Sequence, residues 1–222
     1  MVLKLYGFPA ATCTRRVATV LFEKKVPFEF HTIDLTTGAH KAPAYLEHQP
    51  FGQTPYIDDD GFEIYESRAI GRYIALKYKD QGTPLIPVDA TADLKKTTAF
   101  EVAMQIENQE LDPYSSAIVI EAVFAPAYKP GYKPRKDFLD EKIAILNSKL
   151  DVFEQILSKQ KYLAGDEITL ADLNGIPFNA LLNAAGVDAL DTRPAVSRWW
   201  KDLQARPSFL AFKDGVVAVE KY

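Results

Sequence analysis

The first 80 residues alternate between short apolar runs and segments whose apolar positions recur at helical spacing. Residues 2–6 predict a strand, which glycine and proline end before helical spacing takes over through residues 17–21. Residues 28–33 alternate as a second strand, and residues 42–47 predict a short helix after a polar loop. The chain therefore begins as strand, helix, strand, helix.

A hairpin and a further helix complete this half of the chain. Two short strands over residues 55–57 and 62–64 flank an acidic turn at residues 58–61, which ends in glycine. A helix with one apolar face follows from Glu66. Because parallel strands need crossover helices and a hairpin joins antiparallel strands, the order βαβαββα predicts a mixed sheet with helices on its faces.

The second half of the chain carries helical patterns and no strand patterns. Residues 81–90 contain two prolines and predict a linker between a first domain, 1–80, and an all-helical domain, 91–222. A near-heptad apolar stripe over residues 143–157 is typical of a helix bundle. The segment PAYKPGYKP, residues 126–134, contains three prolines and a glycine, so we expect an aromatic loop without helix there.

The run ITLADL, residues 168–173, has the pattern of a helix start. The Thr169 hydroxyl can accept from the amide three residues later, and the Asp172 carboxylate can accept from the Thr169 amide. Ile168 can in turn pack against Leu173. This capping box accounts for Asp172 as a folding device, and we assign it no chemical role.

The charge and cysteine content of the chain argue against several classes of protein. The chain has 26 basic and 30 acidic residues, a net charge of −4, and no basic cluster that would attract nucleic acid or an anionic membrane. We find no signal segment and no apolar run of the ~18 residues that a membrane span needs. A single cysteine, Cys13, and three histidines without metal-ligand spacing predict no disulfide and no metal site. We expect a soluble, cytoplasmic protein.

Several segments together resemble the Phi class of glutathione transferases, in the order and spacing of that family. They are TRRV at 14–17, the pair His40-Lys41, QPFGQTP at 49–55, ESRAI at 66–70, YLAGDEITLADL at 162–173 and RWWKDLQARPSF at 198–209. The resemblance implies a thioredoxin-like first domain, a helical-bundle second domain, and glutathione as co-substrate.

Glutathione is an extended tripeptide with a carboxylate at each end and a thiol in the middle. Glu66 and Ser67 begin a helix, where free amides and the positive end of the helix dipole attract a carboxylate. Without the resemblance, this pair would be an ordinary helix start. With it, we expect Ser67 to bind the γ-glutamyl carboxylate and Glu66 to meet the ammonium group.

The resemblance places the rest of the tripeptide on two other segments. It implies a cis peptide at Thr54–Pro55, which lets the Thr54 backbone pair with the cysteinyl unit as an added strand would. It also places the glycine carboxylate at a polar loop, where His40 and Lys41 would meet it with help from Gln53. The glutathione-binding residues implied are His40, Lys41, Gln53, Thr54, Pro55, Glu66 and Ser67.

The chemistry requires the thiol to ionise near neutral pH, and here the sequence departs from the family. A family serine donates a hydrogen bond to the sulfur, but its place is taken by Ala11. Thr12 is the adjacent hydroxyl and our candidate catalytic residue, and a backbone amide is another possible donor. Cys13, beside two arginines at a helix start, suggests a different chemistry, mixed-disulfide exchange with glutathione.

The sequence therefore supports one main expected function and several alternatives. The main expectation is conjugation of glutathione to small hydrophobic electrophiles, with peroxide reduction as a further activity. The alternatives are a largely non-catalytic ligand-binding protein, a Cys13-based thiol transferase, or an interaction module. We expect the electrophile between the domains, against Tyr114 and Ile118 and the aromatic loop. The family also forms homodimers, in which Phe51 would enter the partner subunit.

Overall fold

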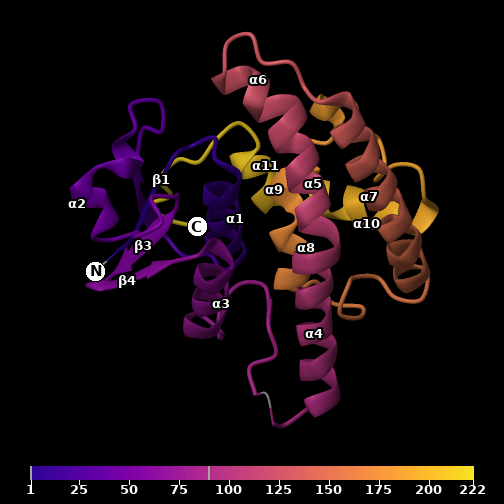
Figure 1. The fold of residues 1–222 in the computed structure, drawn as a ribbon. Coiled ribbons are helices and arrows are strands. Elements are labelled where there is room, and N and C mark those ends of the chain that lie inside the picture. The colour runs from indigo at the N-terminus through magenta and orange to yellow at the C-terminus, as the bar shows by residue number, and fades with distance from the viewer. Residues whose placement is uncertain (1, 90) are drawn as a thin grey trace. The chain divides into compact units, whose positions relative to one another are not determined.

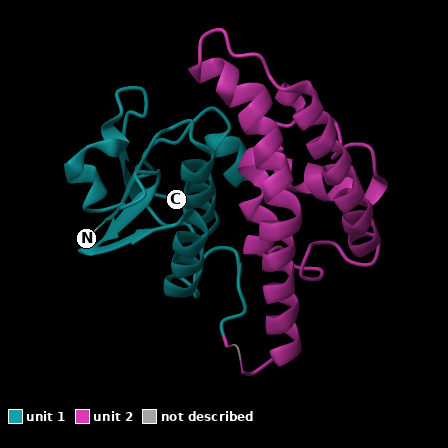
Figure 2. Ribbon diagram, in the orientation of Figure 1, with its two compact units in different colours: residues 1–88, 206–222 teal, residues 89–205 magenta. Residues whose placement is uncertain are grey.

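The computed structural model describes residues 2–89 and 91–222, and its chain divides into two units (Figure 2). Unit 1 runs to Val88 and also includes Arg206–Tyr222, whereas unit 2 is Asp89–Ala205. The helical unit therefore ends before the C-terminus, and not at residue 222 as the sequence suggested. The predicted first domain begins at residue 1 and the predicted linker ends at residue 90, and both positions lie outside the described residues.

Unit 1 contains the predicted order βαβαββα (Figure 1). Its elements are β1 Leu3–Gly7, α1 Thr12–Glu23, β2 Phe28–Thr32, α2 Pro43–Leu46, β3 Tyr56–Asp59, β4 Phe62–Tyr65 and α3 Ser67–Lys77, with a short 3-10 helix, Ala39–Lys41, before α2. The sheet order is β2-β1-β3-β4, with β1 parallel to β2 and the remaining pairs antiparallel. The mixed sheet predicted from the sequence is thus confirmed.

The two faces of the sheet differ in what covers them. Leu5 of β1 and Ile57 of β3 are fully buried on the face covered by α1 and α3, which lie side by side in Figure 1. Tyr6 and Tyr56 stack on the opposite face with ring centroids 4.5 Å apart, and Tyr45 of α2 packs on Tyr56 edge to face. Alternation along β1 and β3 therefore places Leu5 and Ile57 in one layer and the rings of Tyr6 and Tyr56 in the other.

Gly7 permits α1 to pack against the end of β1. A Cβ at this position would lie 2.6 Å from Oγ1 of Thr14, which is fully buried. Such a contact is far below van der Waals distance, so any side chain at Gly7 would push the first turn of α1 away. That turn carries the candidate catalytic residue.

The C-terminal segment joins unit 1 through the end of α1. Helix α11, Pro207–Phe212, packs on α1, and the Glu23 carboxylate accepts from Arg206 Nε at 2.6 Å and from Ser208 Oγ at 2.5 Å. Thr83 Oγ1 donates to the same carboxylate at 2.5 Å. Burial raises the pKa of Glu23, but these hydrogen bonds outweigh it and the net shift is downward. The buried Glu23 carboxylate at the end of α1 thus binds both Thr83 and the C-terminal segment to unit 1.

Apart from one isolated bridge between Tyr162 and Gly165, the elements described in unit 2 are helices, as predicted. Its elements are α4 Leu94–Ile106, α5 Asp112–Val119, α6 Ala125–Tyr128, α7 Lys136–Leu157, α8 Leu170–Asn174, α9 Ile176–Asn179 and α10 Pro194–Gln204, with π-helical turns at Glu107–Leu111 and Ile120–Phe124 and a 3-10 turn at Asn183–Ala185. The stripe predicted from residue 143 to 157 buries Leu146, Leu150, Phe153 and Leu157.

The prediction that residues 126–134 contain no helix is wrong for their first three residues. Pro126 lies inside α6, which continues directly from the second π-helical turn. In each π turn an i→i−5 bond closes just before a proline: Asp112 donates to Glu107 before Pro113, and Ala125 donates to Ile120 before Pro126. The wider turn shifts the hydrogen-bond pattern at the proline, so the missing proline N–H leaves no gap in it. The helix can therefore continue through both prolines.

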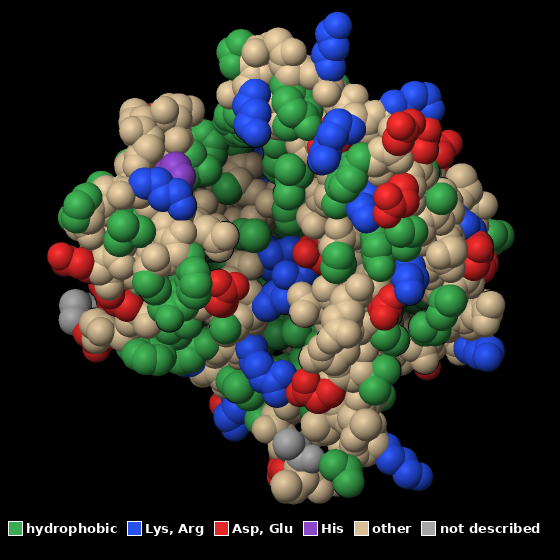
Figure 3. Space-filling view, viewed as in Figure 1, with side chains coloured by type: hydrophobic (Ala, Val, Ile, Leu, Met, Phe, Trp, Pro, Cys, Tyr) green, Lys and Arg blue, Asp and Glu red, His purple; other side chains and the backbone are tan. Residues whose placement is uncertain are grey.

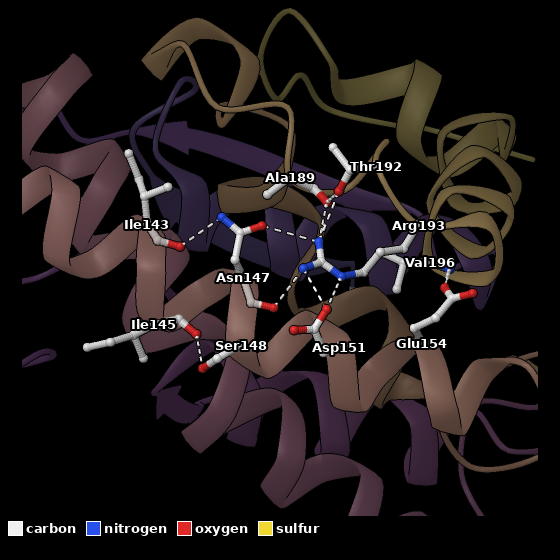
Figure 4. A network of polar contacts seen from close by, with 10 residues as sticks. All are labelled: Ile143, Ile145, Asn147, Ser148, Asp151, Glu154, Ala189, Thr192, Arg193 and Val196. Carbon is white, nitrogen blue, oxygen red and sulfur yellow. Dashed lines mark hydrogen bonds and ion pairs between the residues drawn. The ribbon is translucent and has the colours of Figure 1, made fainter.

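The start of α10 is held by side chains of α7 (Figure 4). The Arg193 guanidinium donates to Asp151 Oδ1 at 2.8 Å and to the Asn147 carbonyl at 2.9 Å. The Glu154 carboxylate accepts from the Ala195 and Val196 amides at 2.9 and 3.0 Å. Glu154 thereby caps a helix that lacks a side-chain cap of its own.

The predicted capping box is confirmed and extends further than expected. Oδ2 of Asp172 accepts from the Thr169 amide at 2.9 Å, and Oδ1 accepts from the Leu163 amide at 2.9 Å and from Trp199 Nε1 at 3.0 Å. The carboxyl group is fully buried, which raises its pKa, while the hydrogen bonds act in the opposite direction. Asp172 therefore joins α8, α10 and the loop at Leu163.

Charged groups of both signs are interspersed on the face of the molecule in view in Figure 3. Within the described ranges, none of the helices combines the length and apolar character needed to cross a membrane.

Candidate functional site

The start of α3 has the geometry of a carboxylate-binding site. Ser67 is the first residue of the helix and is 7% exposed, and the side chain of the N-cap residue, Glu66, does not cap the helix amides. Glu66 precedes it with φ 69° and ψ 102°, a backbone conformation that non-glycine residues rarely adopt. Such conformations concentrate at ligand sites, where the surrounding fold holds them in place. The exposed Glu66 side chain remains accessible to an ammonium group.

Arg16 orients the Ser67 hydroxyl. This arginine of α1 is 1% exposed, and its Nη1 donates to Ser67 Oγ at 2.9 Å. Because the oxygen accepts from Arg16, the single hydroxyl proton can be donated to a carboxylate. A buried cation behind the serine also favours an anion in front of it. From the sequence, Arg16 was expected only as a charge near Cys13, although it belongs to the TRRV segment that carries the resemblance.

His40 and Lys41 lie in the 3-10 helix that leads to α2. Lys41 Nζ donates to the Phe51 carbonyl at 3.1 Å, and His40 Nδ1 is buried with no partner among the described residues. Burial and the neighbouring Lys41 charge lower the pKa of His40, which keeps the ring neutral at neutral pH. A neutral ring can still donate one N–H to a carboxylate.

The segment with Gln53 approaches this helix closely. At Gly52, where φ is +58°, an added Cβ would lie 2.8 Å from the His40 carbonyl oxygen. The backbone of Gln53 is fixed on both sides, since its carbonyl accepts from Tyr45 Oη at 2.6 Å and its amide donates to Gln49 Oε1 at 3.2 Å. The Gln53 side chain is exposed. Gly52 therefore brings Gln53 beside His40 and Lys41, the three residues predicted for the glycine carboxylate.

The Thr54–Pro55 peptide is cis, as the resemblance implied. It lies directly before β3, with Thr54 half-buried and Pro55 buried.

The start of α1 is the candidate site of thiol activation. Ala11 is the N-cap residue with extended backbone and offers no side-chain cap, so the first amides of α1 keep their donor capacity. Thr12 is the first helical residue and is 6% exposed, and its hydroxyl makes no hydrogen bond within the described part of the chain. Cys13 is half-buried, with Arg16 Nη1 3.4 Å from its sulfur. A hydroxyl and several amides can therefore act as donors here.

The residues predicted for the electrophile belong to unit 2. Tyr114 is half-buried on α5, whereas Ile118 is fully buried in the core of that unit. In the aromatic loop, Tyr132 Oη donates to Glu121 Oε1 at 2.7 Å. Arg135 binds the same carboxylate, and these hydrogen bonds lower the pKa of Glu121 to about 2. The assignment of Tyr114 and Ile118 to an electrophile site stays a prediction.

Comparison with known proteins agrees with this geometry. The family model described as the N-terminal domain of glutathione S-transferase matches residues 1–76, and the C-terminal domain model matches residues 116–207. Glutathione S-transferase PM239X14 of Arabidopsis thaliana is 42% identical over 200 residues, covering 89% of each chain.

Solved structures give the same result. Glutathione transferase F7 from Populus trichocarpa superposes with a TM-score of 0.89 at 39% identity, covering 96% of this chain and 98% of that one. Glutathione S-transferase I from maize, in complex with an atrazine glutathione conjugate, has a TM-score of 0.84 at 31% identity and 96% coverage of both chains. The chain therefore belongs to the glutathione S-transferase family, and within it to the Phi class.

Proposed function

We propose that this enzyme conjugates the thiolate of bound glutathione to small hydrophobic electrophiles, and that it uses the residues described above to do so. The observation that carries this assignment is the hydrogen bond from Arg16 of α1 to Ser67 at the start of α3. It places a buried cation and an oriented hydroxyl at a helix N-terminus, where a carboxylate is favoured. Family membership supplies the reaction class.

In the proposed reaction, glutathione lies along one edge of unit 1. Ser67 donates to its γ-glutamyl carboxylate, the Thr54 backbone pairs with the cysteinyl unit, and the segment with Gln53 holds the glycine end. The thiol loses its proton to solvent, and the sulfur lone pair then attacks an electrophilic carbon. In a substitution the leaving group departs with its bonding electrons. In an addition the product takes up a proton.

We expect Ser67→Ala to weaken glutathione binding by about 1–2 kcal/mol, which is a roughly 5- to 30-fold rise in Kd. The lost interaction is a hydrogen bond to a charged carboxylate, and the Arg16 charge remains in place. Titration calorimetry with glutathione measures the change, and turnover of a chromogenic aryl halide tests the reaction itself.

A matched control is Ser148→Ala on the exposed surface of α7, where the serine hydroxyl donates to the Ile145 carbonyl of its own helix. Its glutathione affinity should equal that of the unmodified enzyme. Equal affinities for Ser67→Ala and Ser148→Ala would remove Ser67 from the site. Absence of aryl halide turnover by the unmodified enzyme would favour the ligand-binding alternative.

The proposal also covers the class of electrophile, a second activity and the cellular location. The maize enzyme binds an atrazine glutathione conjugate, which supports a bulky apolar electrophile for the present enzyme as well. Peroxide reduction by the same thiolate is a further activity of the proposal. We also propose a cytoplasmic location, because a lone half-buried cysteine suits a reducing compartment.

We further propose a homodimer in which Phe51 enters the partner subunit. Its ring is 64% exposed and rests edge-on against Tyr65 with centroids 6.2 Å apart, so a large apolar group projects from unit 1. Unit 2 offers a groove of about 580 Å³ between α4 and the end of α7, lined by residues that include Val102, Ile106 and Ile156. A protruding ring and an apolar groove on separate units are complementary features for a closed two-fold dimer.

Phe51→Ser should convert the dimer into monomers at micromolar concentration, because buried aromatic anchors carry much of the energy of an interface. Light scattering measures the mass. Val217→Ser changes another exposed apolar residue, at 63% exposure, and should leave the dimer intact. A dimer that withstands Phe51→Ser, or an unmodified protein that is monomeric, would contradict the proposal.

A further inference from the structure

The chain beyond α11 runs back along unit 1 and bonds to the turn before α1. The Val216 amide donates to the Pro9 carbonyl at 3.1 Å. Val219 and Phe28 exchange two backbone hydrogen bonds of 2.9 and 3.1 Å, which adds one antiparallel bridge to the edge of β2. We call residues 215–219 the strap. It connects the edge of the sheet with the segment that leads into the candidate thiol site.

Pro9 occupies a sensitive position in that segment. The Ala11 amide donates to the Phe8 carbonyl at 3.0 Å, so residues 8–11 form a turn with Pro9 and Ala10 at its centre. The carbonyl of the central peptide takes no part in the turn's own bond, and its direction distinguishes the common turn types. Val216 binds this carbonyl and so fixes the central peptide plane. The next residues are Ala11, the N-cap, and Thr12, the first residue of α1.

Further contacts show that the strap is built onto this site. Val216 is 2% exposed, although Val217 beside it is 63% exposed. Gly215 has a φ of +138°, and a Cβ there would lie 3.6 Å from the Pro9 side chain. The end of the chain is held as well, since the Tyr222 ring packs edge-on against Phe22 of α1 with centroids 5.1 Å apart. The backbone donor that faces the turn therefore belongs to a buried residue, Val216.

We propose that the strap positions the turn at residues 8–11 for thiolate formation, with the Val216 amide as the positioning group. This proposal rests on the proposed transferase function. The donors at the start of α1 follow the turn directly, and their direction toward the sulfur depends on the orientation of the Pro9–Ala10 peptide. The strap itself does not touch the reacting atoms.

The test replaces the positioning donor alone. Val216→Pro removes the amide hydrogen, and Val217→Pro places the same residue where, within the described residues, the amide donates to no group. We expect Val216→Pro to raise the pKa of the bound thiol by up to ~1 unit, so that kcat/KM falls by about 5- to 10-fold near pH 6.5 and recovers as pH rises. Val217→Pro should follow the unmodified enzyme.

Two readouts separate the outcomes. Ultraviolet absorbance of the bound thiolate, titrated with pH, needs only glutathione binding, whereas aryl halide turnover needs the whole reaction. An activity loss in Val216→Pro that is equal at every pH, or an unchanged thiolate titration, would overturn the positioning role. If the unmodified enzyme binds glutathione without turnover, the conjugation assignment fails while the titration still decides on the strap. If it binds no glutathione, both proposals fall.

Discussion

Asp172→Ala is expected to destabilise unit 2 by about 3–5 kcal/mol, the usual cost of removing one member of a buried polar network that involves a charge. The substitution removes the acceptor of four buried donors: the Leu163 amide, the Thr169 amide and hydroxyl, and Nε1 of Trp199. Each unsatisfied group costs roughly 1–3 kcal/mol, so the total exceeds the ~1 kcal/mol of a helix cap alone. Urea denaturation gives the free energy of unfolding.

The reporter for this experiment is intrinsic to the chain. Both tryptophans of the sequence lie in α10, so their fluorescence reports unfolding of unit 2. Glu167→Ala is a matched control. Among the described residues, this exposed acid of the same loop pairs only with the exposed Lys96, so its loss should change stability by less than about 1 kcal/mol. Loss of glutathione affinity in Asp172→Ala protein that remains folded would instead give Asp172 a role in the ligand site.

Asp172 shows which contacts capping rules can predict from a sequence and which they cannot. The capping box is local, and its residues lie within six positions of one another, so the pattern revealed it. The bonds to Leu163 and Trp199 are long-range, and no spacing rule identifies them. The sequence therefore predicted the element and the kind of role, but not the bonds to Leu163 and Trp199.

The prolines of unit 2 illustrate the opposite error. A proline predicts a helix end because it lacks an amide hydrogen and crowds the preceding turn. At Pro113 and Pro126 the chain accommodates both problems with a π-helical turn immediately before the ring. Because a π turn has no residue signature as strong as proline's, the sequence pattern indicated a loop where the helix continues through Tyr128.

The sequence indicated only part of the candidate glutathione site. Glu66 and Ser67 are predicted binding residues because a helix start is visible in the sequence and the ESRAI segment matches the family. Arg16 was missed as a partner of Ser67, since the two residues are 51 positions apart and meet only when α1 packs against α3. The strap was missed for the same reason, and a backbone donor carries no sequence signal at all.

Thr12→Val is expected to raise the pKa of the bound thiol by about 1–2 units, if Thr12 provides the hydrogen bond that the missing family serine would make. The sign follows from the charge. A donor favours the thiolate, so losing it leaves more protonated thiol below the raised pKa and no difference well above it. Near pH 6.5 the thiolate fraction, and with it kcat/KM, should fall roughly 10- to 100-fold.

The companion substitution Ala11→Ser separates Thr12 from the other donors. Ala11 is the N-cap of α1 and makes no side-chain cap, so a serine there should accept from a first-turn amide and stabilise unit 1 by about 1 kcal/mol in every case. Its hydroxyl proton also becomes available to the sulfur. If Thr12 already donates, Ala11→Ser changes the thiol pKa little in the unmodified enzyme but restores it in the Thr12→Val background.

The pH titration of bound-thiolate absorbance across the four proteins decides between the donors. A large drop in the thiol pKa from Ala11→Ser alone, with no effect of Thr12→Val, would show that the hydroxyl position is functionally empty in this chain. No shift in either variant would assign thiol activation to the amides at the start of α1. Activity that then disappears in Cys13→Ser would identify exchange at Cys13 as the chemistry, because that substitution removes the only thiol of the protein.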